Sequence, residues 1–163
     1  MSNVSYTLRD YRPEDFLALW DLDQSCFSFG IAYTQYELRS YMRRPGAFTL
    51  IAQEVMELNR PGLILGFIIA ECSRGAGHVI TIDVRSRAQR QKVGSTLLRS
   101  AEARMKASRC AFVRLETAVN NVVALGFYKA HSYDVVKVIP RYYSNGVDAL
   151  LLEKTLGPSD HIA

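Results

Sequence analysis

The chain has 163 residues, of which 48% are hydrophobic and 22% are charged, and its formal net charge is +4 at pH 7. This composition excludes a disordered chain, a collagen-like fibre and a low-complexity sequence, and the length predicts one folded domain over residues 1–163. The longest nearly apolar run, residues 63–70, is far shorter than the ~20 residues that cross a membrane.

Cysteine usage and the first residues both indicate the cytoplasm. Cys26, Cys72 and Cys110 are widely spaced and form no C-x-x-C motif, so we expect reduced thiols, no disulfide framework and no metal site. The chain begins without the basic and apolar regions of a secretory signal. We therefore expect a cytoplasmic protein that does not associate with membranes.

The first half of the chain predicts a strand, two helices and three antiparallel strands. Residues 4–9 alternate as a strand does, Pro13 opens a helix, and Thr34 caps a second helix that runs to about Met42. Turn residues at 59–62 and 74–77 separate the three strand-like runs, as in an antiparallel meander. Those runs are residues 47–54, 63–72 and 78–84.

The second half predicts helices that alternate with strands. Apolar residues recur at helical spacing from Val93 to Met105. A strand–helix–strand unit requires a right-handed crossover and gives one parallel pair. The predicted fold class is therefore α/β: a mixed, mostly antiparallel twisted sheet with a central parallel pair, helices on both faces, and the order β-α-α-β-β-β-α-β-α-β-β. The later elements are a strand at 110–117, a helix at 121–131, and strands at 133–139 and 149–156.

A basic segment spans residues 85–109, which hold eight basic residues and one acidic residue, Glu102. Such a run is either a solvated helix face or a site for a polyanion. No aromatic residue interrupts it, so a stacking platform for single strands is missing and we expect no nucleic-acid partner. At its start a strand ends and a helix begins, where Gly94 allows close approach and Arg90 and Lys92 add charge, which suits phosphate.

A second motif follows the basic segment. Glu116 stands near a predicted strand end, Asn121 at a helix start, and Tyr128 about two turns into that helix. Taken singly, these residues also fit a solvated carboxylate, a helix cap and a core aromatic.

Together the two segments resemble the GCN5-related N-acetyltransferase (GNAT) superfamily over nearly the whole chain. The phosphate loop of that family reads Gln/Arg-x-x-Gly-x-Gly/Ala. Here residues 89–94 read Gln-Arg-Gln-Lys-Val-Gly, with Lys92 in place of the first glycine. Downstream, Asn121, Ala124 and Tyr128 match the family pattern Asn-x-x-Ala-x-x-x-Tyr.

Finer similarity indicates the branch that acetylates protein N-termini, including the ribosomal-protein alanine acetyltransferases. Residues 141–149, Arg-Tyr-Tyr-Ser-Asn-Gly-Val-Asp-Ala, resemble the last hairpin of that branch. Two features depart from it. Thr117 and Ala118 follow Leu-Glu where the branch has Val-Arg, and residues 31–33 replace a Pro-Trp-Ser-like loop.

The resemblance implies an acyltransferase that moves acetyl from acetyl-CoA directly to a primary amine, foremost the N-terminal α-amine of a protein or peptide. It implies Glu116 as general base, Tyr128 as the acid that protonates the CoA thiolate, and a main-chain amide near Val84 for the oxyanion. The residues expected to bind CoA are Ile82, Asp83, Val84, Gln89, Arg90, Gln91, Lys92, Val93, Gly94, Ser95, Thr96, Asn121, Ala124 and Tyr128. Those expected to bind the acceptor are Phe29, Tyr33, Arg141, Tyr142 and Tyr143.

Two other functions fit the same sequence. One is acetylation of a small-molecule amine such as a polyamine, an amino acid or an antibiotic. The other is a non-catalytic acyl-CoA-binding module, with Lys92 marking a phosphate loop that has lost its glycine. A monomer and a homodimer both fit the sequence.

Overall fold

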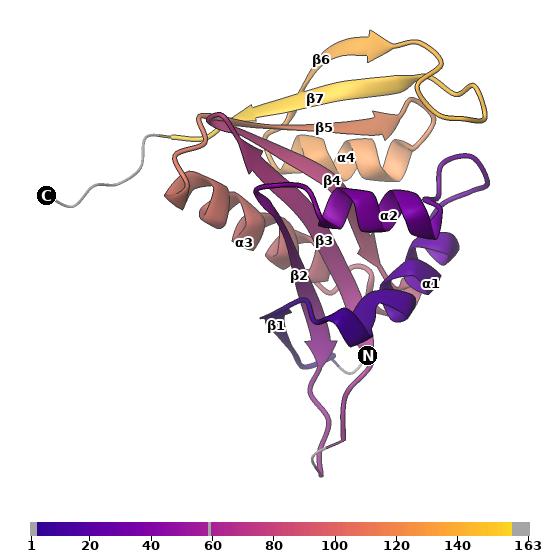
Figure 1. Ribbon diagram of the computed structural model, residues 1–163, viewed down its shortest axis with the longest axis vertical. Helices are drawn as coiled ribbons and strands as arrows, with labels where there is room; N and C mark the ends of the chain where they lie inside the picture. Colours follow the sequence, from indigo (N-terminus) through magenta and orange to yellow (C-terminus); the bar gives the residue numbers. More distant parts are fainter. Residues whose placement is uncertain (1–2, 59, 158–163) are drawn as a thin grey trace, which may run out of the picture.

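The computed structural model describes residues 3–58 and 60–157, which form a seven-stranded sheet with helices on both faces (Figure 1). Its first half holds β1 (Tyr6–Asp10), η1 (Pro13–Asp15), α1 (Phe16–Cys26), α2 (Gln35–Met42), β2 (Ala47–Glu54), β3 (Ile64–Ser73) and β4 (Ala76–Val84). Its second half holds η2 (Ser86–Ala88), α3 (Val93–Ala107), β5 (Phe112–Ala118), α4 (Val122–Ala130), β6 (Asp134–Ile139) and β7 (Ala149–Thr155).

The sheet confirms the predicted fold class. Its order is β1-β2-β3-β4-β5-β7-β6, and every neighbouring pair is antiparallel except β4 and β5. The crossover between these two strands runs through α3, as a parallel connection requires.

Alternating side chains of the sheet build a separate core on each face. On one face, Leu97 and Leu98 of α3 pack with strand residues such as Ile68, and α4 adds Tyr128 to the same core. The helices α1 and α2 cover the opposite face, where Leu19 and Leu38 pack with Ile51, Phe67 and Ile69. These leucines are fully buried, and each contributes about 1.5–3 kcal/mol of transfer free energy.

Local contacts explain where element boundaries differ from prediction. β4 begins at Ala76 instead of residue 78, because Arg74 and Gly75 both have positive φ (53° and 77°) and close a two-residue hairpin turn. The Val4 amide donates to Gln91 Oε1, and β1 begins only at Tyr6. Pro13 opens a 3₁₀ turn before α1 begins. Asn59, in the predicted turn after β2, lies outside the described residues.

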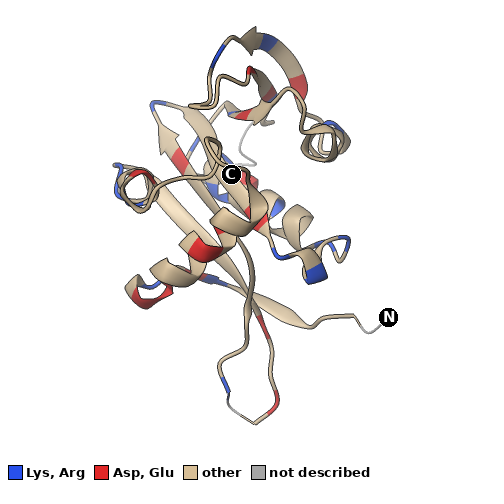
Figure 2. Ribbon diagram, turned by 90° about the vertical axis from the view of Figure 1, so that its right-hand side faces the viewer, with Lys and Arg blue, Asp and Glu red and all other residues tan. Residues whose placement is uncertain are grey.

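Charges of both signs are spread over the ribbon, so net charge alone does not mark a site (Figure 2). In the described part of the chain, every helix falls short of the length and apolarity that a membrane crossing needs.

Candidate active site

The parallel strands β4 and β5 separate along their length. Residues Ala76, Gly77 and His78 pair with Phe112, Val113 and Arg114, and no later ladder pair joins the two strands in the described part of the chain. Figure 1 shows β5 and β7 fanning away from β4. Unpaired strand edges offer main-chain hydrogen-bonding groups to a ligand, so this opening is a candidate site.

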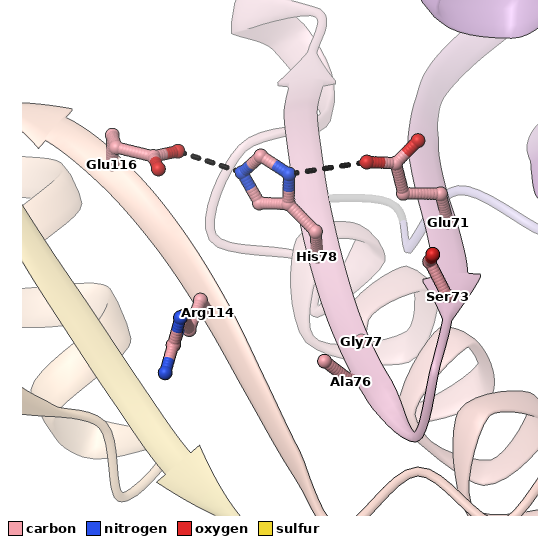
Figure 3. Close-up of a pocket in the computed structure, with 7 residues that line it drawn as sticks. All are labelled: Glu71, Ser73, Ala76, Gly77, His78, Arg114 and Glu116. Atoms are coloured by element: carbon pink, nitrogen blue, oxygen red, sulfur yellow. Dashed lines mark hydrogen bonds and ion pairs between the residues drawn. The ribbon is translucent and has the colours of Figure 1, made fainter. Parts of the chain in front are cut away.

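Glu116 lies beside this opening and contacts a histidine that the sequence analysis missed. His78 Nε2 lies 2.8 Å from Glu116 Oε2, and His78 Nδ1 lies 3.4 Å from Glu71 Oε1 (Figure 3). His78 and Glu116 share a sheet face, because His78 pairs with Arg114 and Glu116 lies two residues beyond Arg114 on β5. A polar residue inside the strand-like run 78–84 was the available signal, but the sequence could not show which residues of β5 face β4.

Burial and the two carboxylates act in opposite directions on His78. Desolvation lowers the pKa of His78, but the hydrogen bonds and charges of Glu116 and Glu71 outweigh it, so the pKa is raised above its ordinary value. A histidine held between two carboxylates is suited to acid–base chemistry.

An open hollow of about 260 Å³ lies over this histidine, lined by Glu71, Ser73, Ala76, Gly77, His78, Arg114 and Glu116. Figure 3 shows these side chains on three adjacent strands. The described residues contain no group of three or more His, Cys, Asp or Glu side chains arranged to hold a metal ion.

Tyr128 approaches the opening from the opposite side, on α4. Its side chain is buried, and its ring makes edge contacts with Phe127 and Tyr133 at centroid distances of 5.2 and 5.7 Å. Burial, followed by the charge of Asp83 and the nearby Tyr143, raises the pKa of Tyr128 well above its ordinary value. The hydroxyl therefore stays protonated at physiological pH and is available as a proton donor.

The basic loop before α3 has left-handed backbone conformations at two non-glycine residues. Lys92 is the N-cap of α3 and has φ +65°, in the left-handed region, and Arg90 has φ +63°. Both side chains are exposed and make no ion pair within the described residues. Two free cations beside a helix N-terminus fit a polyphosphate. The residues present therefore fit the phosphates of CoA.

Several other side chains expected at the CoA site form hydrogen bonds within the protein. The Gln91 side chain accepts from Val4 N and donates to Arg87 O, while Thr96 Oγ1 donates to Lys92 O. Asn121 Oδ1 accepts from Ala124 N, so Asn121 caps α4. The remaining contacts are a donation from Gln89 Nε2 to Val84 O and a bond between Ser95 Oγ and His131 Nε2.

The strand residues and small residues expected at the CoA site point to different faces of the sheet. Ile82, Val84 and Ala124 pack against the core under α3 and α4, and Val93 is buried in it. The Asp83 side chain is buried on the α1 face, which leaves only its main chain for a ligand in the opening. A Cβ on Gly94 would meet only ordinary contacts, at 3.5 Å, so this helix start is not closed to an alanine.

The two loops expected to flank the acceptor contact each other. Ser144 Oγ donates to Gly30 O at 2.9 Å, and Asn145 Nδ2 donates to Phe29 O at 3.4 Å, so the β6–β7 loop rests on the α1–α2 loop. The Phe29 ring itself is 97% exposed. Arg141 is also exposed, and its amide donates to Asp148 Oδ1.

Tyr142 and Tyr143 of the β6–β7 loop lie near Glu116, and Tyr33 of the α1–α2 loop lies near both of them. The rings of Tyr142 and Tyr143 meet edge to face at 4.9 Å, and Tyr33 meets Tyr41 in the same way at 5.2 Å. Burial, then the charge of Glu116, raises the pKa of Tyr142 to about 12. Such aromatic walls with hydroxyl tips suit a peptide segment.

A buried pair of carboxyl groups lies under these loops and was not foreseen. Asp83 Oδ1 accepts from Thr81 Oγ1, and Asp23 Oδ2 accepts from Tyr33 N. The other two oxygens have no donor among the described residues, and the two carboxyls lie within hydrogen-bonding reach of each other. One proton shared between them satisfies both. Burial, then the charge of Asp23, raises the pKa of Asp83 well above its usual range.

Comparison of the fold with solved structures gives matches over almost the whole chain. Ard1 from Thermoplasma volcanium superposes with a TM-score of 0.83 at 24% identity, covering 94% of this chain and 99% of that one. The ribosomal-protein-S18-alanine N-acetyltransferase of Escherichia coli gives a TM-score of 0.80 at 18% identity, covering 98% and 99%. At these identities the matches establish the fold.

Sequence relatives cover part of the chain. An uncharacterised N-acetyltransferase of Methanocaldococcus jannaschii is 33% identical over 94 residues, 57% of this chain and 60% of that protein. N-alpha-acetyltransferase 30 of Dictyostelium discoideum is 34% identical over 97 residues, 56% of this chain and 51% of that protein. The chain thus matches between half and three-fifths of the length of these relatives. The model of the acetyltransferase (GNAT) family matches residues 15–133, so the chain belongs to the GNAT family.

Proposed function

We propose that this chain is an acyltransferase that moves an acetyl group from acetyl-CoA to the N-terminal α-amine of a protein or peptide. The observation that carries the proposal is the hydrogen-bonded pair of His78 and Glu116 beside the opening between β4 and β5, next to the tyrosines of two touching loops. Relatives named N-alpha-acetyltransferase support the choice of amine.

The phosphates of CoA would bind at the basic loop and the start of α3. Arg90 and Lys92 would neutralise their charge, and the free amides of the first helical turn would donate to them. Bound there, acetyl-CoA supplies the activated thioester. A solved NatC complex contains both CoA and a Gag peptide, which shows that this fold holds both ligands in at least one relative.

Glu116 would take a proton from the acceptor amine. An α-amine has a reference pKa near 7.7–8.0, whereas that of lysine is about 10.4, so an α-amine costs roughly 3–4 kcal/mol less to deprotonate at a given pH. A carboxylate base assisted by a neighbouring histidine is therefore better matched to an N-terminus than to a lysine side chain.

The same site would stabilise the other charges of the reaction. The main-chain amide at Val84, at the end of β4 that pairs with β3 but not with β5, would donate to the oxyanion that develops on the acetyl carbonyl. The Tyr128 hydroxyl would protonate the departing thiolate. Its raised pKa makes it a weak acid, but a thiolate leaving into a buried site is also more basic than in water.

A peptide panel tests this function directly. The assay measures thiol release from acetyl-CoA with three acceptors: a peptide with a free N-terminus, the same peptide blocked at its N-terminus but carrying lysine, and spermidine. We expect the free N-terminus to react fastest. Faster reaction of spermidine would indicate a small-molecule acetyltransferase. CoA binding by calorimetry without turnover of any amine would indicate a binding module.

A further inference from the structure

Three polar residues form a row across adjacent strands on the sheet face that α1 and α2 cover. Glu71 of β3 and His78 of β4 are direct cross-strand partners. Glu116 lies on β5, two residues beyond the strand partner of His78. Figure 3 shows the imidazole between the two carboxylates. Glu116 has a role in the proposed transfer, whereas Glu71 has none there.

The two contacts of the imidazole are unequal, and this fixes where its protons lie. A carboxylate can only accept, so the 2.8 Å contact with Glu116 requires a hydrogen on Nε2. The contact with Glu71 is 3.4 Å, which is long for an N–H···O bond. The Nδ1 hydrogen is therefore the one that leaves first, into the hollow that His78, Glu71 and Glu116 line.

The protonation state of His78 Nδ1 affects how well Glu116 accepts a proton. When both ring nitrogens carry hydrogen, an imidazolium cation lies against Glu116 and weakens it as a proton acceptor. When the Nδ1 hydrogen has left, the neutral ring still donates through Nε2 and holds the carboxylate in place. Glu116 is then a stronger base in an unchanged position.

We propose that Glu71 is a positioning residue that governs Glu116 through His78. Its carboxylate holds the hydrogen on Nδ1, and Glu116 becomes a working base once that hydrogen has gone to water in the hollow. In each turnover an N–H bond of the ammonium breaks and the proton goes to Glu116, then to water. The C–N bond then forms as the C–S bond breaks, and the thiolate takes its proton from Tyr128. The second proton of the attacking nitrogen restores the Tyr128 hydroxyl through water, so a single proton leaves for the solvent. The inference rests on the proposed function.

Other charged and titratable groups around the row come from every element packed against it. Arg44, after α2, lies 3.4 Å from Glu71 and is about half exposed. The remaining groups are Arg114 on β5, Tyr41 on α2, and Tyr142 and Tyr143 of the β6–β7 loop. Of these, Arg44 acts on Glu71 directly. Replacing Arg44 should therefore shift the His78 titration in the direction opposite to replacing Glu71.

The first arm of the test follows the imidazole of His78 by NMR titration in the protein without ligands. The chain has three histidines, His78, His131 and His161, so loss of one signal in His78→Gln gives the assignment. Glu71→Gln removes a charge that favours imidazolium, so the His78 titration should move down by about one pH unit. Arg44→Gln removes a nearby cation and should move it in the opposite direction.

The second arm measures kcat against pH with saturating free-N-terminus peptide. The acidic limb in Glu71→Gln should move to lower pH with the His78 titration, while Glu71→Asp, which keeps the charge, should stay closer to wild type. Glu54→Gln serves as the matched control, because Glu54 is also ion-paired (to Arg87, 2.7 Å) but lies outside the hollow. Glu54→Gln should change neither the His78 titration nor the acidic limb of kcat.

An unmoved His78 titration in Glu71→Gln would overturn the inference. So would a moved titration with an unmoved limb, because Glu71 would then tune the imidazole without acting on the base. If the wild-type protein acetylates no amine at all, the proposed function fails first, and the inference falls with it.

Discussion

Tyr128 is the residue proposed to act as the acid that protonates the CoA thiolate. Tyr128→Phe keeps the ring and its edge contacts with Phe127 and Tyr133 and removes only the hydroxyl. We expect kcat to fall roughly 10²-fold, the usual contribution of a positioned acid, with acetyl-CoA binding unchanged by calorimetry. Tyr36→Phe, at an exposed position on α2, is the control. An unchanged kcat would leave Tyr128 as a core aromatic only.

The left-handed backbone conformation of Lys92 is strained. A non-glycine residue in the left-handed region costs about 1–2 kcal/mol of folded-state stability, and glycine avoids this cost. Glycine also gives the unfolded chain more conformational entropy, which cancels part of the gain. Lys92→Gly should therefore raise the free energy of unfolding by up to about 1 kcal/mol, measured in urea. Lys92→Val should lower it, because a β-branched residue fits φ +65° poorly. Lower stability of the glycine variant would contradict this interpretation.

The junction of α1 with β4 depends on the proton shared by Asp23 and Asp83. The folded-state pKa of each is raised, so the stability that the pair contributes is present at low pH and is lost as pH rises through that folded value. Each unit of raised pKa is worth about 1.4 kcal/mol. Asp83→Asn can donate without a shared proton and keeps an acceptor for Thr81.

We therefore expect the stability advantage of Asp83→Asn over wild type to grow as pH rises from 5 to 8. Urea unfolding at a series of pH values measures it, and every other titrating group cancels in the comparison. Parallel pH profiles for the two proteins would show that no proton is shared.

Contact between the α1–α2 and β6–β7 loops shapes the acceptor side. Gly30 has φ +84°, and a Cβ there would lie 2.6 Å from Asn145 Cβ, so Gly30→Ala must push the loops apart. We expect KM for the peptide to rise several-fold and KM for acetyl-CoA to stay constant. Gly146→Ala is the matched control, because Gly146 has the same φ with nothing within 4 Å of its Cβ. Equal effects of both changes would attribute the result to backbone strain alone.

Much of the whole molecule was predictable because local patterns agree with the tertiary contacts. The turn residues that separate the strand-like runs of β2, β3 and β4, the helical spacing of Val93 to Met105 and the capping residue Thr34 all act over a few residues, and the structure confirms those elements. The predicted element boundaries were wrong where a contact remote in sequence or a turn determined them. Val4, for example, hydrogen-bonds to Gln91 and lies outside β1.

The site was predictable only where residues lie in one motif. Glu116 and Tyr128 share a segment, whereas His78 and Glu71 reach Glu116 through strand register, which the sequence does not state. The partners Asp23 and Asp83 are 60 positions apart and come together only when α1 packs on β4. Lys92 was visible as a departure from a motif, but its left-handed conformation required the structure.

A single peptide that carries both a free N-terminus and an internal lysine shows which amine this chain acetylates. After incubation with acetyl-CoA, tandem mass spectrometry locates the added acetyl group. We expect acetylation at the N-terminus, with the lysine unmodified until the α-amine is consumed. Acetylation that begins on the lysine, with the N-terminus free, would contradict this expectation.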